Sequence, residues 1–351
     1  MKKETRKRIM IFSLIAVLAA AGIVFVLLSK KDGSQEKKNI KIGVTMYKIN
    51  DTFLSGMMDD LTKDANDYEQ KTGIKVDLDI SGAKDSQRMQ NDQVKRYVSY
   101  AYDVIVVNPV DRTNISSIID MASEAGIPLI FFNREPVSVD IFRENDIYYV
   151  GSDAKMTAVM EGEIVADAYK KNPRSIDLNG DGIINYVMLE GEMGHQDAII
   201  RTEWSTQTLI DNGLKINRLD SKTANWERSQ AAVLMEQWLD DFGSDIELVL
   251  CNNDDMALGA ADTLQTHQIQ NIAVVGIDAT AQGLAAVKDG RMLGTVDANA
   301  KGQAEAIFKL ASGLALNGKP PQDLVMDAGR YVRADLIKIT RDTLPDEEDK
   351  Q

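Results

Sequence analysis

The chain has 351 residues, a formal net charge of -14 and a sequence pI near 4.7. This length exceeds what one compact core usually serves, which favours two lobes. The acidic balance argues against a nucleic-acid-binding protein, because contact with phosphates needs a basic surface. The single cysteine, Cys251, excludes a disulfide within the chain.

The amino-terminal residues predict a membrane anchor. A basic end at residues 1–8 precedes an apolar run at 9–28, which is long enough for a helix to cross about 30 Å of hydrocarbon. The positive-inside rule places the rest of the chain outside the cytoplasm, and the polar residues 29–38 form a linker. A cleaved signal peptide is the alternative, although cleavage after the alanines at 19–21 would leave an exposed apolar end. We expect an anchored protein on the extracytoplasmic face of the membrane, or a periplasmic or secreted protein if the segment is cleaved.

Short apolar runs alternate with longer amphipathic segments through the rest of the chain. This alternation is typical of parallel strands joined by crossover helices, and it predicts an α/β fold with doubly wound sheets. The expected strands cover residues 40–46, 76–80, 104–107, 129–132, 148–151, 186–189, 248–251 and 273–277.

Polar or aromatic side chains follow nearly every expected strand. Ligands of doubly wound sheets bind beyond the carboxyl ends of the strands. Asn and Asp at such positions also cap the next helix, and capping is the commoner role for any single one. Their repetition favours a binding site. The residues concerned are Asp51, Phe53, Asn108, Asn133, Asp153, Asn253, Asp254 and Asp278.

A run from Asp177 to Asn185 has the spacing of a calcium-binding loop. Oxygen ligands stand at its first, third, fifth and ninth positions, a backbone carbonyl is expected from Ile183, and Gly182 allows the sharp turn. The twelfth position, normally a bidentate Glu, is Met188, so a carboxylate has to come from elsewhere in the fold. A metal-free Asx turn is the alternative. The side-chain ligands predicted for Ca²⁺ are Asp177, Asn179, Asp181 and Asn185.

The residues favour binding over catalysis. The chain has two histidines, and it has no Gly-x-Ser-x-Gly elbow, no Gly-rich phosphate loop and no His-Glu-x-x-His motif. A pair of catalytic carboxylates among 54 acidic residues stays an open alternative. A sugar-binding site uses Asp and Asn as hydrogen-bonding groups and flat aromatic rings against the C–H faces of the sugar. Trp226 and Phe53 are candidates for those rings.

The chain resembles the periplasmic glucose/galactose-binding proteins of ABC transport and chemotaxis. The resemblance covers roughly residues 40 to 340, and the motifs that carry it are residues 42–48 leading to Asp51 and Phe53, the calcium loop, residues 194–197 with Arg201, Trp226, and residues 252–254. It implies a type I periplasmic-binding-protein fold, with two α/β lobes joined by three crossing strands. The expected N-terminal lobe covers 39–127 and 297–333, and the C-terminal lobe covers 128–296 and 334–351.

The resemblance also assigns roles to residues. It implies sugar binding by Asp51, Phe53, Asn108, His195, Asp197, Arg201, Trp226, Asn253 and Asp278, and it places the missing calcium carboxylate at Glu247. One position departs from the family, because Ala298 stands where an Asn of the last crossing strand bonds the sugar. Asp297 or Asn299 would have to replace that bond.

The resemblance implies a non-enzymatic, monomeric protein that binds glucose or galactose and delivers it to an ABC permease. The same binding could serve a chemoreceptor or a sensor kinase, and the sequence does not distinguish these outputs. A sugar-responsive repressor is excluded, because the residues before Ile40 form an apolar run instead of a basic helix-turn-helix. We expect a slot between two lobes that closes on a neutral monosaccharide.

Overall fold

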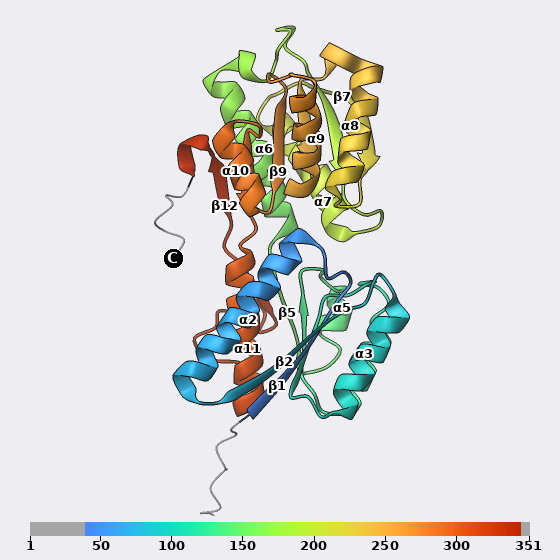
Figure 1. The fold of residues 1–351 in the computed structure, drawn as a ribbon, viewed down its shortest axis with the longest axis vertical. Helices are drawn as coiled ribbons and strands as arrows, with labels where there is room; N and C mark the ends of the chain where they lie inside the picture. The colour runs from blue at the N-terminus through green and yellow to red at the C-terminus, as the bar shows by residue number, and fades with distance from the viewer. Residues whose placement is uncertain (1–38, 345–351) are drawn as a thin grey trace, which may run out of the picture.

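The computed structural model describes residues 39–344, whose strands form two sheets in two lobes stacked along the long axis (Figure 1). The first sheet has the order β11-β5-β4-β3-β1-β2, and all its strands are parallel. Its strands are β1 (Asn39–Met46), β2 (Lys75–Gly82), β3 (Val104–Val107), β4 (Leu129–Phe132), β5 (Ile147–Gly151) and β11 (Tyr331–Arg333).

The second sheet repeats this arrangement with the order β12-β10-β9-β8-β6-β7. Only β12 runs antiparallel to its neighbour in this described sheet. Its strands are β6 (Ile184–Glu190), β7 (Ile216–Thr223), β8 (Leu248–Cys251), β9 (Ala273–Ile277), β10 (Gly294–Asp297) and β12 (Ile337–Thr340).

Helices cover both faces of each sheet, because the inner strands are apolar on both faces. In β3, for example, Val104 and Val106 enter one core and Ile105 and Val107 enter the core on the opposite face. The first lobe holds α2 (Thr52–Thr72), α3 (Gln87–Ser99), α4 (Ser116–Glu124), α5 (Ser138–Ile141) and α11 (Ala300–Asn317). The second lobe holds α6 (Ala154–Lys171), α7 (Gln196–Asp211), α8 (Arg228–Phe242), α9 (Asp254–Thr266) and α10 (Ala281–Asp289). Short 3-10 turns occupy Pro173–Ser175, Gly243–Asp245 and Arg341–Thr343.

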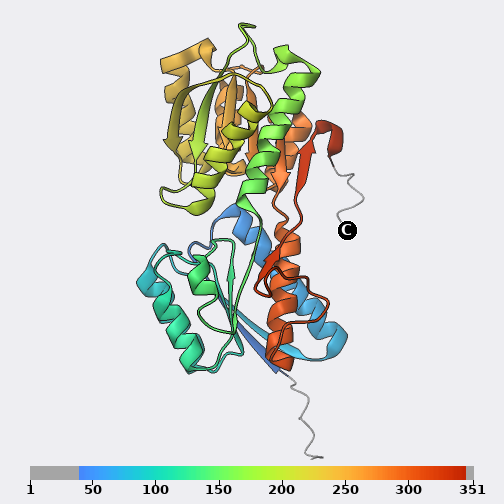
Figure 2. The ribbon, with the colours of Figure 1, turned by 180° about the vertical axis from the view of Figure 1, so that it is seen from behind.

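The chain passes between the lobes three times, as predicted. The crossings follow β5, β10 and β11, and the view from behind shows the later two side by side (Figure 2). The predicted lobe boundary between residues 127 and 128 does not agree with the sheets. Strands β4 and β5 pair with the first sheet, so the first crossing comes after Gly151. The boundaries predicted near residues 297 and 333 lie at the other two crossings.

The predicted cytoplasmic end at 1–8, anchor at 9–28 and linker at 29–38 lie outside the described residues, as does the end of the predicted second lobe at 345–351. Within 39–344, no helix is long and apolar enough to cross a membrane.

Candidate functional site

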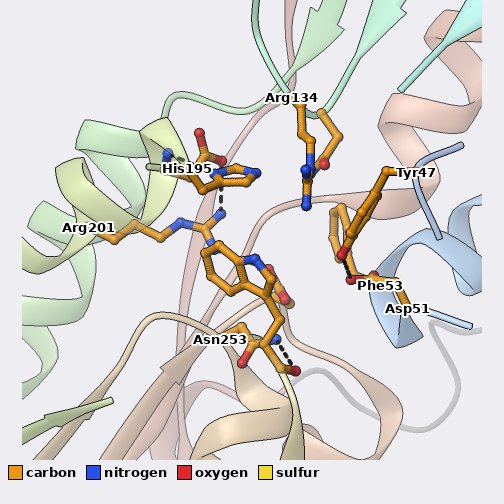
Figure 3. Close-up of a pocket in the computed structure, with 11 residues that line it drawn as sticks. Tyr47, Asp51, Phe53, Arg134, His195, Arg201 and Asn253 are labelled. Atoms are coloured by element: carbon orange, nitrogen blue, oxygen red, sulfur yellow. Dashed lines mark hydrogen bonds and ion pairs between the residues drawn. The ribbon is translucent and has the colours of Figure 1, made fainter. Parts of the chain in front are cut away.

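A cavity lies between the lobes, where the carboxyl ends of the two sets of parallel strands face each other. Eight of the nine residues predicted to bind sugar line it, together with three others. Figure 3 shows these side chains pointing inward from both lobes. The lining residues are Tyr47, Asp51, Phe53, Asn133, Arg134, His195, Asp197, Arg201, Trp226, Asn253 and Asp278.

Asp51 both caps a helix and lines the cavity. Its Oδ1 accepts a hydrogen bond from the backbone N–H of Leu54 at 2.9 Å, which begins α2. Its Oδ2 accepts from the Tyr47 hydroxyl at 2.9 Å. The cap therefore fixes the carboxylate in place while leaving lone pairs for a ligand.

Arg134 stacks on Tyr47, and both residues belong to the first lobe. Its guanidinium carbon lies 3.5 Å from the centre of the Tyr47 ring, which is a close cation–π contact. Its Nη2 donates to Glu192 of the second lobe at 2.7 Å, and its Nη1 donates to the Val110 carbonyl at 3.0 Å. Burial raises the pKa of the Tyr47 hydroxyl, and the nearby Asp51 carboxylate raises it further. Tyr47 is therefore a neutral hydrogen-bond donor.

Trp226 forms an aromatic wall from the second lobe. Its backbone has φ 66°, a left-handed conformation that is rare for a bulky residue and recurs at functional sites. A side chain at Gly191 would collide with the indole, so glycine is required there. Phe53 is half-buried on the first-lobe core and supplies the second ring of the cavity.

His195 carries a defined tautomer. Its Nδ1 accepts a hydrogen bond from the Asp197 backbone N–H at 3.1 Å, which caps α7 and assigns the ring proton to Nε2. Its ring stands edge-on to Trp226, with centroids 5.1 Å apart. Burial lowers the pKa of His195 well below its ordinary value, and Arg134, Arg201 and Arg112 lower it further. The ring is therefore neutral and offers Nε2–H as a donor.

Arg201 is held between two carboxylates. Its guanidinium lies 3.7 Å from Asp197 and 3.8 Å from Asp278, and Nη1 donates to the Asn252 carbonyl at 2.8 Å. Its Nε is buried and has no partner among the described residues. Burial raises the pKa of Asp278 and of Asp197, while Arg201 opposes that rise in both. The group brings two carboxylates and one guanidinium to the second-lobe side of the cavity.

Asn253 also combines a cap with a lining position. Its Oδ1 accepts from the Met256 backbone N–H at 3.0 Å and begins α9, while its Nδ2 donates to the Trp226 carbonyl at 3.4 Å. Asp51, His195 and Asn253 each cap a helix and also line the cavity. Helix capping and ligand binding are therefore compatible roles for polar residues that follow strands.

The sequence profile of the periplasmic binding protein domain matches residues 42–320. The chain belongs to the periplasmic binding protein family. The galactose/methyl-galactoside-binding periplasmic protein of Haemophilus influenzae is 33% identical over 308 residues, covering 87% of this chain and 91% of the relative. A rhizopine-binding protein of Rhizobium meliloti, described as putative, is 32% identical over 285 residues, covering 79% and 86%. A solved ABC transporter solute-binding protein of Bacillus halodurans with bound myo-inositol superposes with a TM-score of 0.73 at 31% identity, covering 89% and 98%.

Members of this family are solute-binding proteins of ABC transport that work outside the cytoplasm and catalyse no reaction. The predicted type I two-lobe fold is thereby confirmed, as is the prediction that the chain is not an enzyme.

The lobes of this periplasmic binding protein touch across the cleft. Glu192 of the second lobe accepts from Arg134 at 2.7 Å and pairs with Lys48 at 3.4 Å. Lys48 also lies 3.6 Å from Glu227, and Thr52 donates to Asp255 at 2.5 Å. These contacts join the lobes around the cavity.

Two sequence predictions differ from the geometry. Asn108 does not line the cavity, because its amide is fully buried and bonds the Phe132 carbonyl and the Asn133 side chain, both at 3.1 Å. It supports Asn133, which does line the cavity. Neither Asp297 nor Asn299 lines the cavity in place of Ala298. Asn299 caps α11, and Asp297 accepts the Asn299 N–H.

Three lining residues carried no prediction as ligands: Tyr47, Asn133 and Arg134. Tyr47 and Asn133 directly follow β1 and β4, and Arg134 comes one residue later, so position was the signal available in the sequence. Asn133 was noted as following a strand, whereas arginine is mostly exposed in proteins and tyrosine is intermediate, so neither residue type marked a ligand.

The predicted calcium ligands lie together at the end of the second lobe away from the first (Figure 1). Glu247 reaches the loop as predicted: Oε1 accepts from the N–H of Leu178 at 2.8 Å and of Asn179 at 3.1 Å, and Oε2 accepts from Asn185 at 2.8 Å. Asp177 accepts from the N–H groups of Gly180 and Gly182. No group of three or more acidic, His or Cys side chains within 39–344 has the arrangement of a metal site.

Proposed function

We propose that this protein binds glucose or galactose between its lobes and delivers the unchanged sugar to an ABC permease, acting as a monomer. The observation that carries this proposal is the cavity itself. Two aromatic rings, Phe53 and Trp226, enter it from opposite lobes, and the remaining walls are hydrogen-bonding groups.

The chemistry of these walls suits a neutral hexose. Carboxylates at Asp51, Asp197 and Asp278 accept from hydroxyls, and Arg201 and neutral His195 donate to them. The aromatic rings match the C–H faces of a pyranose. A carboxylate accepts from a C4 hydroxyl in either orientation, so Asp51 is compatible with both glucose and galactose.

The relatives support a hydroxyl-rich ligand and differ in which one. The Haemophilus relative is described as binding galactose and methyl-galactoside, and the Bacillus halodurans structure holds myo-inositol. Ribose-binding relatives reach 26% identity over 288 residues. The choice of a hexose rests on the cavity residues and on the Haemophilus relative.

Calorimetry against glucose, galactose, ribose and myo-inositol tests the proposal. We expect a one-to-one complex with at least one of the two hexoses and weaker or absent binding of ribose. Mass spectrometry of the recovered sugar should show no chemical change. Heat with ribose or inositol alone, or conversion of the sugar, would contradict the proposal.

We also propose that the loop 177–185, with Glu247, holds a Ca²⁺ ion. The ligand set of carboxylate, amide and carbonyl oxygens is the one calcium prefers. The residues fit in part, because Glu247 contacts the loop from a distant segment and Asp177 and Glu247 are buried carboxylates. The backbone N–H bonds to each Asp177 oxygen leave one lone pair free on each. Such an ion would brace the loop and would not touch the sugar.

We propose further that residues 9–28 keep the protein on the outer face of the membrane. Strand β1 begins at the end of the first lobe opposite the cleft (Figure 1), so an anchor there would leave the cleft free. The test is extraction of membranes at alkaline pH, which should leave the full chain in the pellet. Release of a shortened chain into the soluble fraction would favour a cleaved signal peptide instead.

A further inference from the structure

Asp254 is the first residue of α9, and it does not line the sugar cavity. Its side chain is fully buried, and a buried carboxylate is costly unless donors satisfy it. Oδ2 accepts from the Thr280 backbone N–H at 2.8 Å and from the Thr280 hydroxyl at 3.2 Å, and Oδ1 accepts from the Thr295 hydroxyl at 2.6 Å. These bonds connect the start of α9 to β10 and to the turn that carries Asp278.

Two consecutive backbone N–H groups of this turn depend on Asp254. The N–H of Thr280 bonds the carboxylate directly. The N–H of Ala279 donates at 3.2 Å to the Thr295 hydroxyl, which in turn donates to Asp254. Asp278 and Ala279 have φ 121° and φ 51°, which are conformations that favour glycine. Such a backbone persists only where its surroundings hold it, and these hydrogen bonds do so.

Two glycines make room for the Asp254 carboxylate. A side chain at Gly276 in β9 or at Gly283 in α10 would collide with it, and neither glycine has the positive φ that would otherwise explain its presence. Glycine weakens both strands and helices, so its use at these two positions has a cost in stability. Asn253 already caps α9, so this room serves the contacts of Asp254 with the turn.

We propose that Asp254 is a positioning residue for the bound sugar: with Thr295, it holds the turn that directs Asp278 into the cavity. Arg201 lies 3.8 Å from the Asp278 carboxylate and orients the side chain, whereas Asp254 fixes the backbone that carries it. Hydrogen bonds weaken steeply with misalignment, so a shift of this turn would weaken the bond from Asp278 to a sugar hydroxyl. This inference rests on the proposed hexose binding and adds a residue that does not touch the sugar.

A double-mutant cycle between Thr295 and Asp278 tests the proposal. Thr295→Val has a similar shape, changes no charge and removes the buried hydroxyl that joins Asp254 to Ala279. We expect it to weaken binding of the tightest-binding hexose by about 3- to 30-fold. In an Asp278→Ala background the same substitution should change the affinity by less than about twofold, because the carboxylate that the hydroxyl helps to place is absent.

Tryptophan fluorescence measures the four affinities, because Trp226 lines the cavity and a soluble sugar can be added at high concentration where binding is weak. Thr295→Ser restores the hydroxyl and should restore the affinity close to that of the wild type. Thr263→Val is the matched control. It removes another buried threonine hydroxyl of the same lobe, one that donates to the Ala232 carbonyl, and it should leave the affinity unchanged.

Equal affinities of Thr295→Val and wild type, or an equal loss in both backgrounds, would overturn the proposal, because the hydroxyl would then not act through Asp278. If circular dichroism shows that Thr295→Val does not fold, Thr295→Cys takes its place in the cycle, since a thiol is a weak hydrogen-bonding group of similar size. A wild type that binds no hexose would contradict the proposed function, and this inference with it. A wild type that binds hexose without the coupling would overturn this inference alone.

Discussion

Asp278 illustrates how one residue of the site is held for binding. It directly follows β9 with φ 121°, a conformation that favours glycine, and its N–H donates to the Val296 carbonyl at 2.7 Å. Strained backbone at a non-glycine residue persists where the surroundings hold it, and it clusters at binding sites. The strain here directs a carboxylate into the cavity beside Arg201.

We predict that Asp278→Asn weakens hexose binding by roughly 10- to 100-fold, since a hydrogen bond to a charged acceptor is worth about 1.5–3 kcal/mol. Calorimetry gives the affinity, and thermal unfolding checks that the fold persists. Asp59→Asn, an exposed site on α2, is the matched control. An unchanged affinity in Asp278→Asn would remove this carboxylate from the ligand contacts.

Glu161 lies fully buried on α6 behind the site, and it gives a prediction about pH. Its Oε1 accepts from the Cys251 N–H at 3.4 Å, its Oε2 has no partner within 39–344, and burial raises its pKa well above the ordinary value. Because the folded-state pKa is raised, the folded protein is most stable relative to the unfolded chain below the ordinary pKa, and stability falls as pH rises through the folded value.

Glu161→Gln removes this titration, so the variant should unfold at a higher temperature than the wild type at pH 8 and at a similar temperature near pH 4.5. A rise of at least about 2 °C at pH 8 would be significant for a domain of this size. Glu124→Gln, exposed on α4, is the control. Parallel stability curves for wild type and Glu161→Gln across this pH range would show that Glu161 does not titrate as proposed.

Residue positions at strand ends were predictable from the sequence, whereas side-chain directions were not. Apolar runs mark where buried strands end, so Asp51, Asn253 and Asp278 could be identified as candidates. Asn108 has the same sequence signal but turns inward to bond Phe132 and Asn133. Arg134 was missed because its burial depends on Tyr47 and on Glu192 in the other lobe, which no local pattern records.

At the scale of elements, the apolar runs predicted seven of the eight inner strands of the described sheets, all except β10, and among the edge strands they predicted β2 but not β7, β11 or β12. The strand β7 alternates little and is largely polar, because as an edge strand it pairs on one side only. The lobe boundary was placed too early because β4 and β5 have the same apolar pattern in either sheet. The sheet that a strand joins is decided by its hydrogen-bonded pairing with neighbouring strands. That pairing depends on residues far away in the sequence.

Glu247, which directly precedes β8, bonds the loop before β6, and these contacts give a prediction about calcium. Glu247 serves three backbone N–H groups, so Glu247→Ala should lower Tm even without metal. If calcium binds there, 1 mM Ca²⁺ should raise Tm of the chelator-treated wild type by several degrees and leave Glu247→Ala unchanged. Differential scanning calorimetry measures both effects.

Glu124→Ala should respond to calcium as the wild type does, since its side chain is exposed on α4 in the other lobe. A wild-type Tm that is the same with chelator and with calcium would favour the metal-free turn. A calcium response retained in Glu247→Ala would reject Glu247 as a ligand while leaving the loop as a site.

At the scale of the whole molecule, two lobes joined by three crossings are an arrangement that can open and close around a ligand. The three crossings are the only backbone connections between the lobes within the described chain, so closure depends on side-chain contacts and on the ligand. A sugar that touches both walls binds the closed form better than the open form, and this difference in affinity shifts the population.

Lys48 provides a test of that coupling because it does not line the cavity yet pairs with Glu192 and Glu227 of the opposite lobe. These pairs are partly exposed, so each contributes about 0.2–1 kcal/mol to the closed form. We predict that Lys48→Gln weakens hexose binding by roughly 2- to 10-fold, mainly through faster dissociation. Stopped-flow fluorescence measures the dissociation rate, with Lys309→Gln as the control because Lys309 pairs with Asp323 inside the first lobe.

Ionic strength separates this explanation from a general loss of stability. Screening weakens partly exposed ion pairs, so raising salt from 10 mM to 1 M should speed dissociation from the wild type. The same change should have a smaller effect on Lys48→Gln, which has already lost the pairs. If the two proteins respond equally to salt, the contacts of Lys48 do not help to hold the lobes together, and the closed form depends on the ligand and on the pair between buried Arg134 and partly buried Glu192.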